Sequence, residues 1–163
     1  HLHHVAGLAV TLAEMLAFGR EYAKATIENA KVLAQALYEE GFNVLCEHRG
    51  FTESHQVVMD VSTLGGGDLV AKTLEKANII ANKNMLPWDR EPQTPSGLRL
   101  GVQELTRLGM GPSEMKEIAT LMRKVLMDGK EPREVRMEVA ELRKSFQKVH
   151  FCFDNGDAYE CPV

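Results

Sequence analysis

Cysteine is scarce in this sequence, and a block of basic residues is absent from it. The 163 residues include three cysteines, Cys46, Cys152 and Cys161. This odd and sparse set argues against a disulfide scaffold and predicts a reducing, cytoplasmic compartment. Lys and Arg number 19 against 23 Asp and Glu, which gives a net charge of −4. Nucleic acid and an anionic membrane surface are therefore not expected partners.

Membrane-spanning and secretory signals are also missing from the pattern. No apolar run approaches the ~20 residues that cross a bilayer, and no basic head with a small-residue cleavage site opens the chain. The chain lacks an initiating methionine and runs from His1 directly into the apolar residues 5–10. Because natural N-termini seldom begin inside a core helix, we expect a fragment whose upstream part is missing.

Helical periodicity dominates residues 1–40. Apolar side chains recur at spacings of four and three from Leu8 to Phe18, and Gly41 supplies the left-handed stop that often ends a helix. Gly19 marks a bend, or a join between two helices. We predict one or two linking helices over this range.

A smaller domain is predicted for residues 41–127. Strands are expected at residues 42–46, 55–61, 79–82 and around 99, and helices at 69–77, 102–107 and 113–127. This order predicts an α+β two-layer sandwich. The glycine run after Thr63 matches neither a dinucleotide-binding nor a P-loop fingerprint, so we predict a plain loop there. Asp68 and Ser113 are the expected caps of the helices that follow them.

Residues 128–163 are predicted to form an extension of one helix and one hairpin. Pro132 opens the helix, and the Asn155-Gly156 pair is a strong signal for a two-residue hairpin turn within residues 150–161. Pairing through that turn places His150, Cys152 and Cys161 on one face. Three such ligands could hold zinc, but no fourth ligand is evident, and a half-buried apolar hairpin is the preferred interpretation. Whether these residues bind a metal stays open.

Arg99 is the main candidate for binding chemistry. It stands on a short apolar run between Gly97 and Gly101, where its guanidinium can hold a carboxylate through two parallel hydrogen bonds. The alternative is a solvated surface arginine. A twelve-residue loop, residues 83–94, precedes this strand; it contains two prolines and the single tryptophan, and a loop of that length is usually functional when ordered.

Two other polar positions have both a functional and a structural interpretation. His55 could be a general base, but it has no identifiable nucleophile or carboxylate partner, which favours a hydrogen-bonded structural histidine. Asn84 could read the edge of a heterocycle through paired hydrogen bonds, although asparagine is also a common turn former. No catalytic pair and no metal cluster can be assembled from the composition and spacing.

The order of four motifs carries a family resemblance. They are His3-His4-Val5-Ala6-Gly7-Leu8-Ala9-Val10, Ser54-His55-Gln56-Val57-Val58-Met59-Asp60, Ala81-Asn82-Lys83-Asn84 and Ser96-Gly97-Leu98-Arg99-Leu100-Gly101. Together they closely resemble the C-terminal part of the serine hydroxymethyltransferase family, from about residue 3 to residue 127. The resemblance implies the small C-terminal domain of the aminotransferase-like fold (fold type I of pyridoxal-phosphate enzymes), with an antiparallel sheet covered by helices.

The resemblance also implies an activity and roles for particular residues. The family consists of pyridoxal 5'-phosphate-dependent homodimers that convert serine and a tetrahydropterin to glycine and a methylene-tetrahydropterin. By position, Arg99 matches the arginine that binds the substrate carboxylate and Asn84 matches the asparagine that contacts the pterin. Glu91, Pro92 and Gln93 fall where the family's loop lies along the folate. The Schiff-base lysine lies upstream in the family, so this chain supplies no catalytic residue and is expected to be inactive alone.

Several residues depart from the family's usual pattern. Pro95 replaces a threonine, residues 102–104 read Val-Gln-Glu where Thr-Pro-Ala is usual, and Glu91-Pro92-Gln93 replaces Ser-Pro-Phe. The extension after Met127 resembles the archaeal branch, where the carrier is either tetrahydrofolate or a methanopterin-type pterin. Two alternatives stay open: an aldolase-type pyridoxal-phosphate enzyme acting on serine or threonine without a pterin, and a non-catalytic amino-acid-binding or interaction domain.

Overall fold

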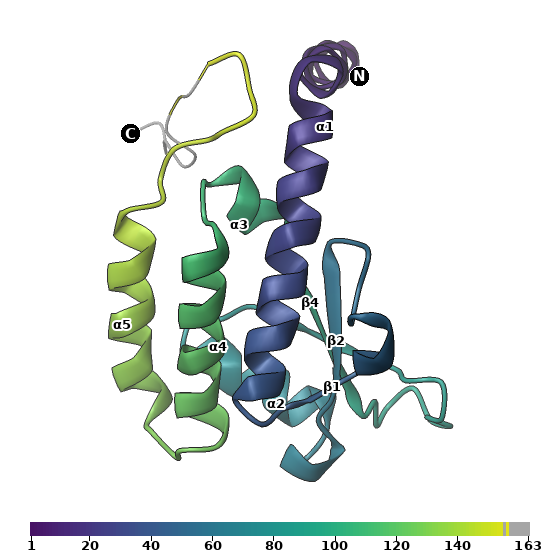
Figure 1. Cartoon of the computed structure of the whole chain (residues 1–163), viewed down its shortest axis with the longest axis vertical. Coiled ribbons are helices and arrows are strands. Elements are labelled where there is room, and N and C mark those ends of the chain that lie inside the picture. The colour runs from purple at the N-terminus through teal and green to yellow at the C-terminus, as the bar shows by residue number, and fades with distance from the viewer. Residues whose placement is uncertain (155, 157–163) are drawn as a thin grey trace.

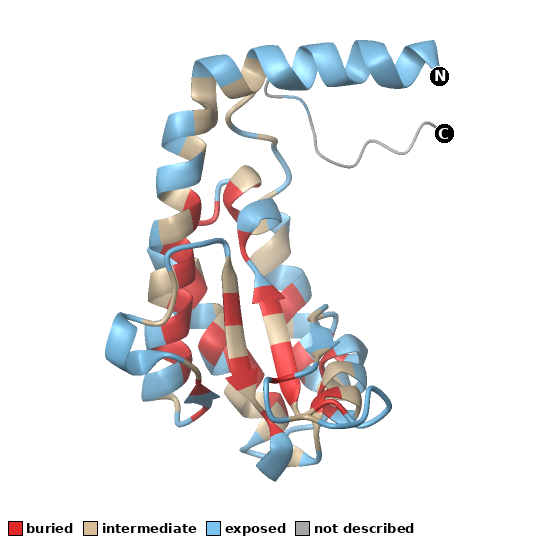
Figure 2. Cartoon of the chain, turned by 90° about the vertical axis from the view of Figure 1, so that its right-hand side faces the viewer, coloured by how far each residue is buried: buried red, intermediate tan, exposed pale blue. Residues whose placement is uncertain are grey.

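A single long helix, α1 (Leu2–Glu39), precedes the rest of the chain in the computed structural model, which describes residues 1–154 and 156. Figures 1 and 2 show that α1 bends without interruption, so one helix forms where one or two were predicted. Figure 2 shows exposed residues over the part of α1 before the bend. After the bend, α1 contributes Ala30, Leu33 and Leu37 to the core. Its second half is therefore an integral part of the packed domain.

Four antiparallel strands form one sheet in the order β1-β2-β4-β3. The strands are β1 (Asn43–Val44), β2 (Gln56–Asp60), β3 (Asn82–Asn84) and β4 (Gly97–Gly101). In the ladder, Arg99 pairs with Val58 on one side and Asn82 on the other. The antiparallel sheet with helices confirms the predicted α+β class.

Five helices and two 3-10 turns complete the described chain. After α1 come η1 (Glu47–Arg49), η2 (Ser62–Leu64), α2 (Gly67–Lys76), α3 (Gln103–Arg107), α4 (Pro112–Leu126) and α5 (Pro132–Lys144). One core joins the helices to the inner sheet face, where Met59 and Leu98 are fully buried. Burying side chains of this size stabilises the fold by about 1.5–3 kcal/mol each. Val135 and Val139 of α5 belong to the same core. The predicted division of the chain into three segments, at residues 40 and 127, stays a prediction.

The strand before Arg99 begins later than predicted. It was expected at residues 79–82 and forms at Asn82–Asn84. The reason is the end of α2: Asn78 adopts a left-handed φ of 60°, and the Ile79 amide donates a hydrogen bond back to the Leu74 carbonyl at 3.0 Å. The β1 strand is likewise cut to two residues, because Cys46 has a φ of 64° and leads into η1.

Both predicted helix caps are wrong. Gly66 is the N-cap of α2, and Asp68 lies in the first turn, where its carboxylate pairs with Lys72. Gly111 is the N-cap of α4, and its amide donates to Glu114 Oε2 at 2.7 Å. In each helix a carboxylate, Asp68 in α2 and Glu114 in α4, lies in the first turn after the N-cap. The positive end of the helix dipole favours a negative charge there.

The C-terminal hairpin prediction is also wrong in its described part. Residues 151–154 form bends, and Phe151 has a φ of 56°. The amide of Val149 donates to the Gly156 carbonyl at 3.1 Å, which does not fit the predicted pairing of His150 with Cys161. The His150 amide instead donates to the Arg107 carbonyl at 2.7 Å. Cys161 lies outside the described residues.

The apolar character of α1 exceeds what the sequence pattern predicted. By length and composition alone α1 could cross a membrane, because it contains an 18-residue window of mean hydropathy 1.3, none of it buried within the chain. The expectation that no apolar run approaches a membrane span is therefore wrong. Glu14 is the first Asp, Glu, Lys or Arg of the chain, so the first thirteen residues contain none of these four residue types. An apolar helix that is buried against other parts of a protein has the same composition as a membrane-spanning helix.

Candidate functional site

Arg99 lies on the sheet face that the helices do not cover. Side chains alternate along a strand, and Leu98 and Leu100 of β4 are buried in the core, so Arg99 points to the opposite face. Residues directly opposite each other in a sheet share a face. The register therefore places these residues on what we call the Arg99 face: Gln56, Val58, Asp60, Asn82, Asn84, Gly97, Arg99 and Gly101.

Arg99 forms no ion pair within the described part of the chain. Its guanidinium has no hydrogen-bond or ion-pair partner among residues 1–154 and 156, and its side chain is half-buried. The acidic residue on the same face is Asp60, whose Oδ1 accepts a hydrogen bond from the Ser62 amide at 2.9 Å. A half-buried arginine without an acidic partner can bind an external carboxylate.

The Asn82-Lys83-Asn84 motif divides between the two faces of the sheet. Asn82 and Asn84 share the Arg99 face, whereas Lys83 pairs in register with Leu98 and bonds to Asp68 at 2.6 Å. The Asn84 amide nitrogen donates to the Met85 carbonyl at 2.7 Å. The structure thus brings Asn84 onto the same face as Arg99, although its predicted role there stays a prediction.

Asp89 fastens together the two ends of the loop between β3 and β4. Its Oδ2 accepts hydrogen bonds from the Leu86 and Ser96 amides, each at 2.8 Å, and its Oδ1 accepts one from the Ser96 hydroxyl at 2.6 Å. The hydroxyl bond from Ser96, followed by the two amide bonds, lowers the pKa of Asp89. Asp89 was not among the candidates predicted from the sequence. The available signal was an aspartate in a proline-containing loop, a residue type that often bonds to nearby backbone amides.

The predicted loop contacts Glu91, Pro92 and Gln93 are all exposed. The Thr94 amide donates to the Glu91 carbonyl at 3.2 Å, so these three residues form a tight turn. Trp88, in the same loop, is 55% exposed. An exposed turn in the loop that leads into β4 is free to contact a bound molecule.

The glycine run before α2 is not a phosphate cradle. The amides of Gly65, Gly66 and Gly67 donate to the carbonyls of Ser62, Val61 and Pro95 at 3.2, 3.0 and 2.8 Å. Phosphate binding at a loop of this kind requires converging amides that are free to donate. The interpretation of this segment as a plain loop is consistent with these bonds, and the loop does not fit the phosphate of a cofactor.

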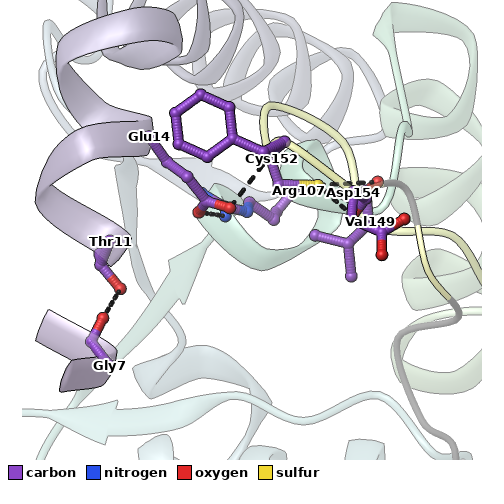
Figure 3. A network of polar contacts seen from close by, with 8 residues as sticks. Gly7, Thr11, Glu14, Arg107, Val149, Cys152 and Asp154 are labelled. Atoms are coloured by element: carbon purple, nitrogen blue, oxygen red, sulfur yellow. Dashed lines mark hydrogen bonds and ion pairs between the residues drawn. The ribbon is translucent and has the colours of Figure 1, made fainter. Parts of the chain in front are cut away.

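The remaining candidates are not brought together with Arg99. His55 precedes β2 and is exposed, and its carbonyl accepts the Val102 amide at 3.1 Å. In residues 1–154 and 156 no group of three or more His, Cys, Asp or Glu side chains is placed to hold a metal. The Cys152 Sγ lies 3.4 and 3.0 Å from the Val149 and Asp154 carbonyl oxygens, within hydrogen-bond reach of both (Figure 3). The three-ligand set that includes Cys161 extends beyond the described residues.

Comparisons with known proteins agree on one family. The family model for serine hydroxymethyltransferase matches residues 1–122. A serine hydroxymethyltransferase of Korarchaeum cryptofilum is 62% identical over 98% of this chain and 38% of its own length. One of Methanopyrus kandleri is 59% identical over 99% of this chain and 39% of its length. The chain therefore spans less than two-fifths of these relatives.

A solved structure resembles the fold as well. It is the L-threonine transaldolase of Pseudomonas fluorescens in its internal aldimine state, with a TM-score of 0.75 and 32% identity. The match covers 89% of this chain and 33% of that one. The predicted fold, the small domain of the aminotransferase-like architecture, is confirmed.

Proposed function

Because this chain belongs to the serine hydroxymethyltransferase family, we propose that it is the C-terminal part of a pyridoxal 5'-phosphate-dependent enzyme. The proposed reaction converts serine and a tetrahydropterin to glycine and a methylene-tetrahydropterin. The observation that carries the proposal for this chain is the guanidinium of Arg99, which forms no ion pair among the described residues, on the open sheet face. Identities of 62% and 59% to relatives bearing the family's name support it.

Arg99 binds the α-carboxylate of serine or glycine in this proposal. Strand β4 is held on both sides by β2 and β3, which fixes the backbone from which the arginine projects. Two parallel N–H to oxygen bonds would fix both the position and the plane of the carboxylate. This arrangement leaves the α-carbon in a defined orientation, and that orientation is the contribution of this chain to catalysis.

Asn84 and the loop supply the contacts to the pterin. Asn84 shares the face of Arg99, and the exposed turn Glu91-Pro92-Gln93 lies in the loop that joins Asn84 to β4. An amide can pair with the donor and acceptor edge of a pterin ring. The carrier is tetrahydrofolate or a methanopterin-type pterin, and the archaeal relatives favour neither one over the other.

The cofactor is held by another part of the enzyme in this proposal. The glycine loop before α2 does not fit a phosphate, since all three of its glycine amides already donate to carbonyls. In this proposal, residues 1–154 and 156 therefore bind and orient the substrate. On this basis we expect no hydroxymethyltransferase activity from this chain alone.

Exposed apolar residues on α1 support a proposal of homodimer formation. Leu2, Val5, Leu8, Leu12 and Leu16 are all more than half exposed, and Leu16 is 91% exposed. A helix that is apolar on all sides is normally buried. Contact with the rest of the enzyme or with a second copy would cover these residues. A cytoplasmic location without membrane or nucleic-acid partners belongs to the same proposal.

An aldolase-type enzyme without a pterin is the second candidate. The structural similarity to an L-threonine transaldolase favours it. That similarity comes with 32% identity, against 62% for the hydroxymethyltransferase relative. Omission of the pterin from a full-length enzyme assay distinguishes the two, since an aldolase would cleave its substrate at an undiminished rate.

The carboxylate assignment is tested in the full-length protein by Arg99→Ala and Arg99→Lys. Loss of a bidentate charged contact in a desolvated site costs on the order of 2–5 kcal/mol, so we expect serine affinity to fall at least about thirtyfold in Arg99→Ala. Lysine should restore only part of it, because it lacks the planar fork. Arg136→Ala, an exposed arginine on α5, is the matched control. Unchanged serine affinity in Arg99→Ala would refute the assignment.

A further inference from the structure

We propose that Asp89 is a positioning residue that holds the Leu86 side chain against the Arg99 face as an apolar wall of the substrate site. The inference deepens the proposed function, because it assumes that Arg99 binds a carboxylate. It concerns residues to which neither the family resemblance nor the comparisons assign a role. The Asp89 carboxylate acts through Leu86 and Ser96, and it need not contact substrate.

The Asp89 carboxylate joins residues from both ends of the loop. Leu86 lies two residues after the end of β3, and Ser96 lies immediately before the start of β4. One carboxylate accepts hydrogen bonds from both amides and from the Ser96 hydroxyl, at 2.6–2.8 Å. Bonds to an ionised acceptor are about twice as strong as neutral ones. The loop is thus closed at its base while residues 91–93 remain exposed.

Leu86 is buried on the side of the sheet away from the main core. It is 4% exposed, yet it is not part of the core cluster that contains Met59 and Leu98. A Cβ built on Gly97 would lie 2.6 Å from Leu86 Cδ2 and 2.8 Å from Leu86 Cγ. Gly97 shares the face of Arg99, because both alternate with the buried Leu98. Leu86 therefore covers the strand position two residues before Arg99.

An apolar side chain at this position strengthens the interaction of Arg99 with an anion. In this proposal it excludes water from one side of the guanidinium and lowers the local dielectric, which increases the attraction between opposite charges. The Asp89 carboxylate already accepts three hydrogen bonds, and Asp89 forms no ion pair with Arg99. Asp89 can hold the wall without competing for the substrate-binding guanidinium.

Hydrogen exchange on this chain tests the loop closure without reference to catalysis. In Asp89→Ala, the Leu86 and Ser96 amides lose their acceptor and should exchange at least about tenfold faster. The ladder amides of β2 should be unaffected, which separates local opening from global unfolding. Asp128→Ala, which removes an aspartate paired with Arg123, is the control and should leave both amides protected. Unchanged protection of Leu86 and Ser96 in Asp89→Ala would overturn the proposal.

Kinetics of the full-length protein test the consequence for substrate. Asp89→Ala and Leu86→Ala should each raise the KM for serine about tenfold and leave kcat within about twofold of its original value. The reason is that a displaced or missing Leu86 side chain weakens substrate binding more than it slows the chemical step. The double variant should be no worse than either single one, because Asp89 acts through Leu86. Additive effects, or an unchanged KM in Asp89→Ala, would refute this inference even if Arg99→Ala abolishes binding. If Arg99→Ala leaves binding intact, the proposed function fails, whatever the exchange experiment shows.

Discussion

Glu14 of α1 and Arg107 of α3 form an ion pair, with 2.8 Å between Oε2 and Nη2, that links positions 93 residues apart (Figure 3). Both side chains are largely buried, at 13% and 24% exposed. The Arg107 guanidinium also lies 5.8 Å from the centre of the Tyr22 ring, and Glu14 Oε1 accepts the Phe153 amide at 3.3 Å. The pair thus ties α1, α3 and the C-terminal segment together.

We expect a double-mutant cycle of Glu14→Gln and Arg107→Met to give a coupling energy of about 1 kcal/mol, since partial burial limits screening of the pair. Methionine retains apolar packing where the arginine stem lies. The exposed pair Glu141 and Lys144, at 73% and 71% exposed, is the control and should couple by less than about 0.3 kcal/mol. Urea unfolding measures both cycles, and equal coupling energies would contradict the prediction.

Asn29 is a buried amide on which two other elements depend. Its Nδ2 donates to Thr106 Oγ1 and to the Met110 carbonyl, both at 2.9 Å, and the residue is 3% exposed. Asn29→Ala should destabilise the fold by about 2 kcal/mol, because a buried carbonyl is left without its donor. Gln35→Ala removes an exposed amide of the same helix and should cost less than about 0.5 kcal/mol. The urea midpoint is the measurement, and similar midpoints for the two variants would contradict this account.

Gly67 and Gly7 should respond to alanine with opposite signs. A Cβ on Gly67 would lie 2.3 Å from the Gly97 carbonyl oxygen, a backbone atom of β4 that cannot move aside cheaply. We expect Gly67→Ala to destabilise the protein by about 2 kcal/mol. Gly7 lies in α1 with nothing within 4 Å, so Gly7→Ala should stabilise the helix by about 0.5–1 kcal/mol. Thermal unfolding followed by circular dichroism compares them, and a shift of the same sign would be inconsistent with the packing described.

Asp68 should titrate well below an ordinary aspartate. Hydrogen bonds from Lys72 and then from Lys83, at 2.6 Å each, lower its pKa to about 2. Because the folded pKa lies below the unfolded value of about 3.9, the stabilisation is fully present above pH 4 and is lost as the pH falls toward 2. Lys83→Met should raise the pKa of Asp68, as read from its carboxyl carbon by NMR. Glu53→Gln, remote from this pair, should leave it unchanged, and a pKa near 3.9 in the unmodified chain would contradict the structure.

The sequence predicted some of the local structure and failed where tertiary contacts compete. Glycines on either side of an apolar run correctly located the strand that carries Arg99. The Asn155-Gly156 pair suggested a hairpin, but turn propensity is a local preference. The His150 amide is taken by the Arg107 carbonyl and the Phe153 amide by Glu14, so these donors are unavailable to a hairpin ladder. Distant partners of this kind leave no periodic signal in the sequence.

What the sequence by itself determined is the family, the α+β class and the strand on which Arg99 stands, because motif order, periodicity and glycine placement are properties of the chain alone. Only the tertiary structure decided which residues share the Arg99 face and which of them have partners. The sheet register places Asn84 on the same face as Arg99, opposite Gly97, and turns Lys83 away from that face toward Asp68. The burial of Leu86 against Gly97 and the three hydrogen bonds of Asp89 likewise exist only once the loop is closed, since they depend on distances between atoms that the sequence places apart.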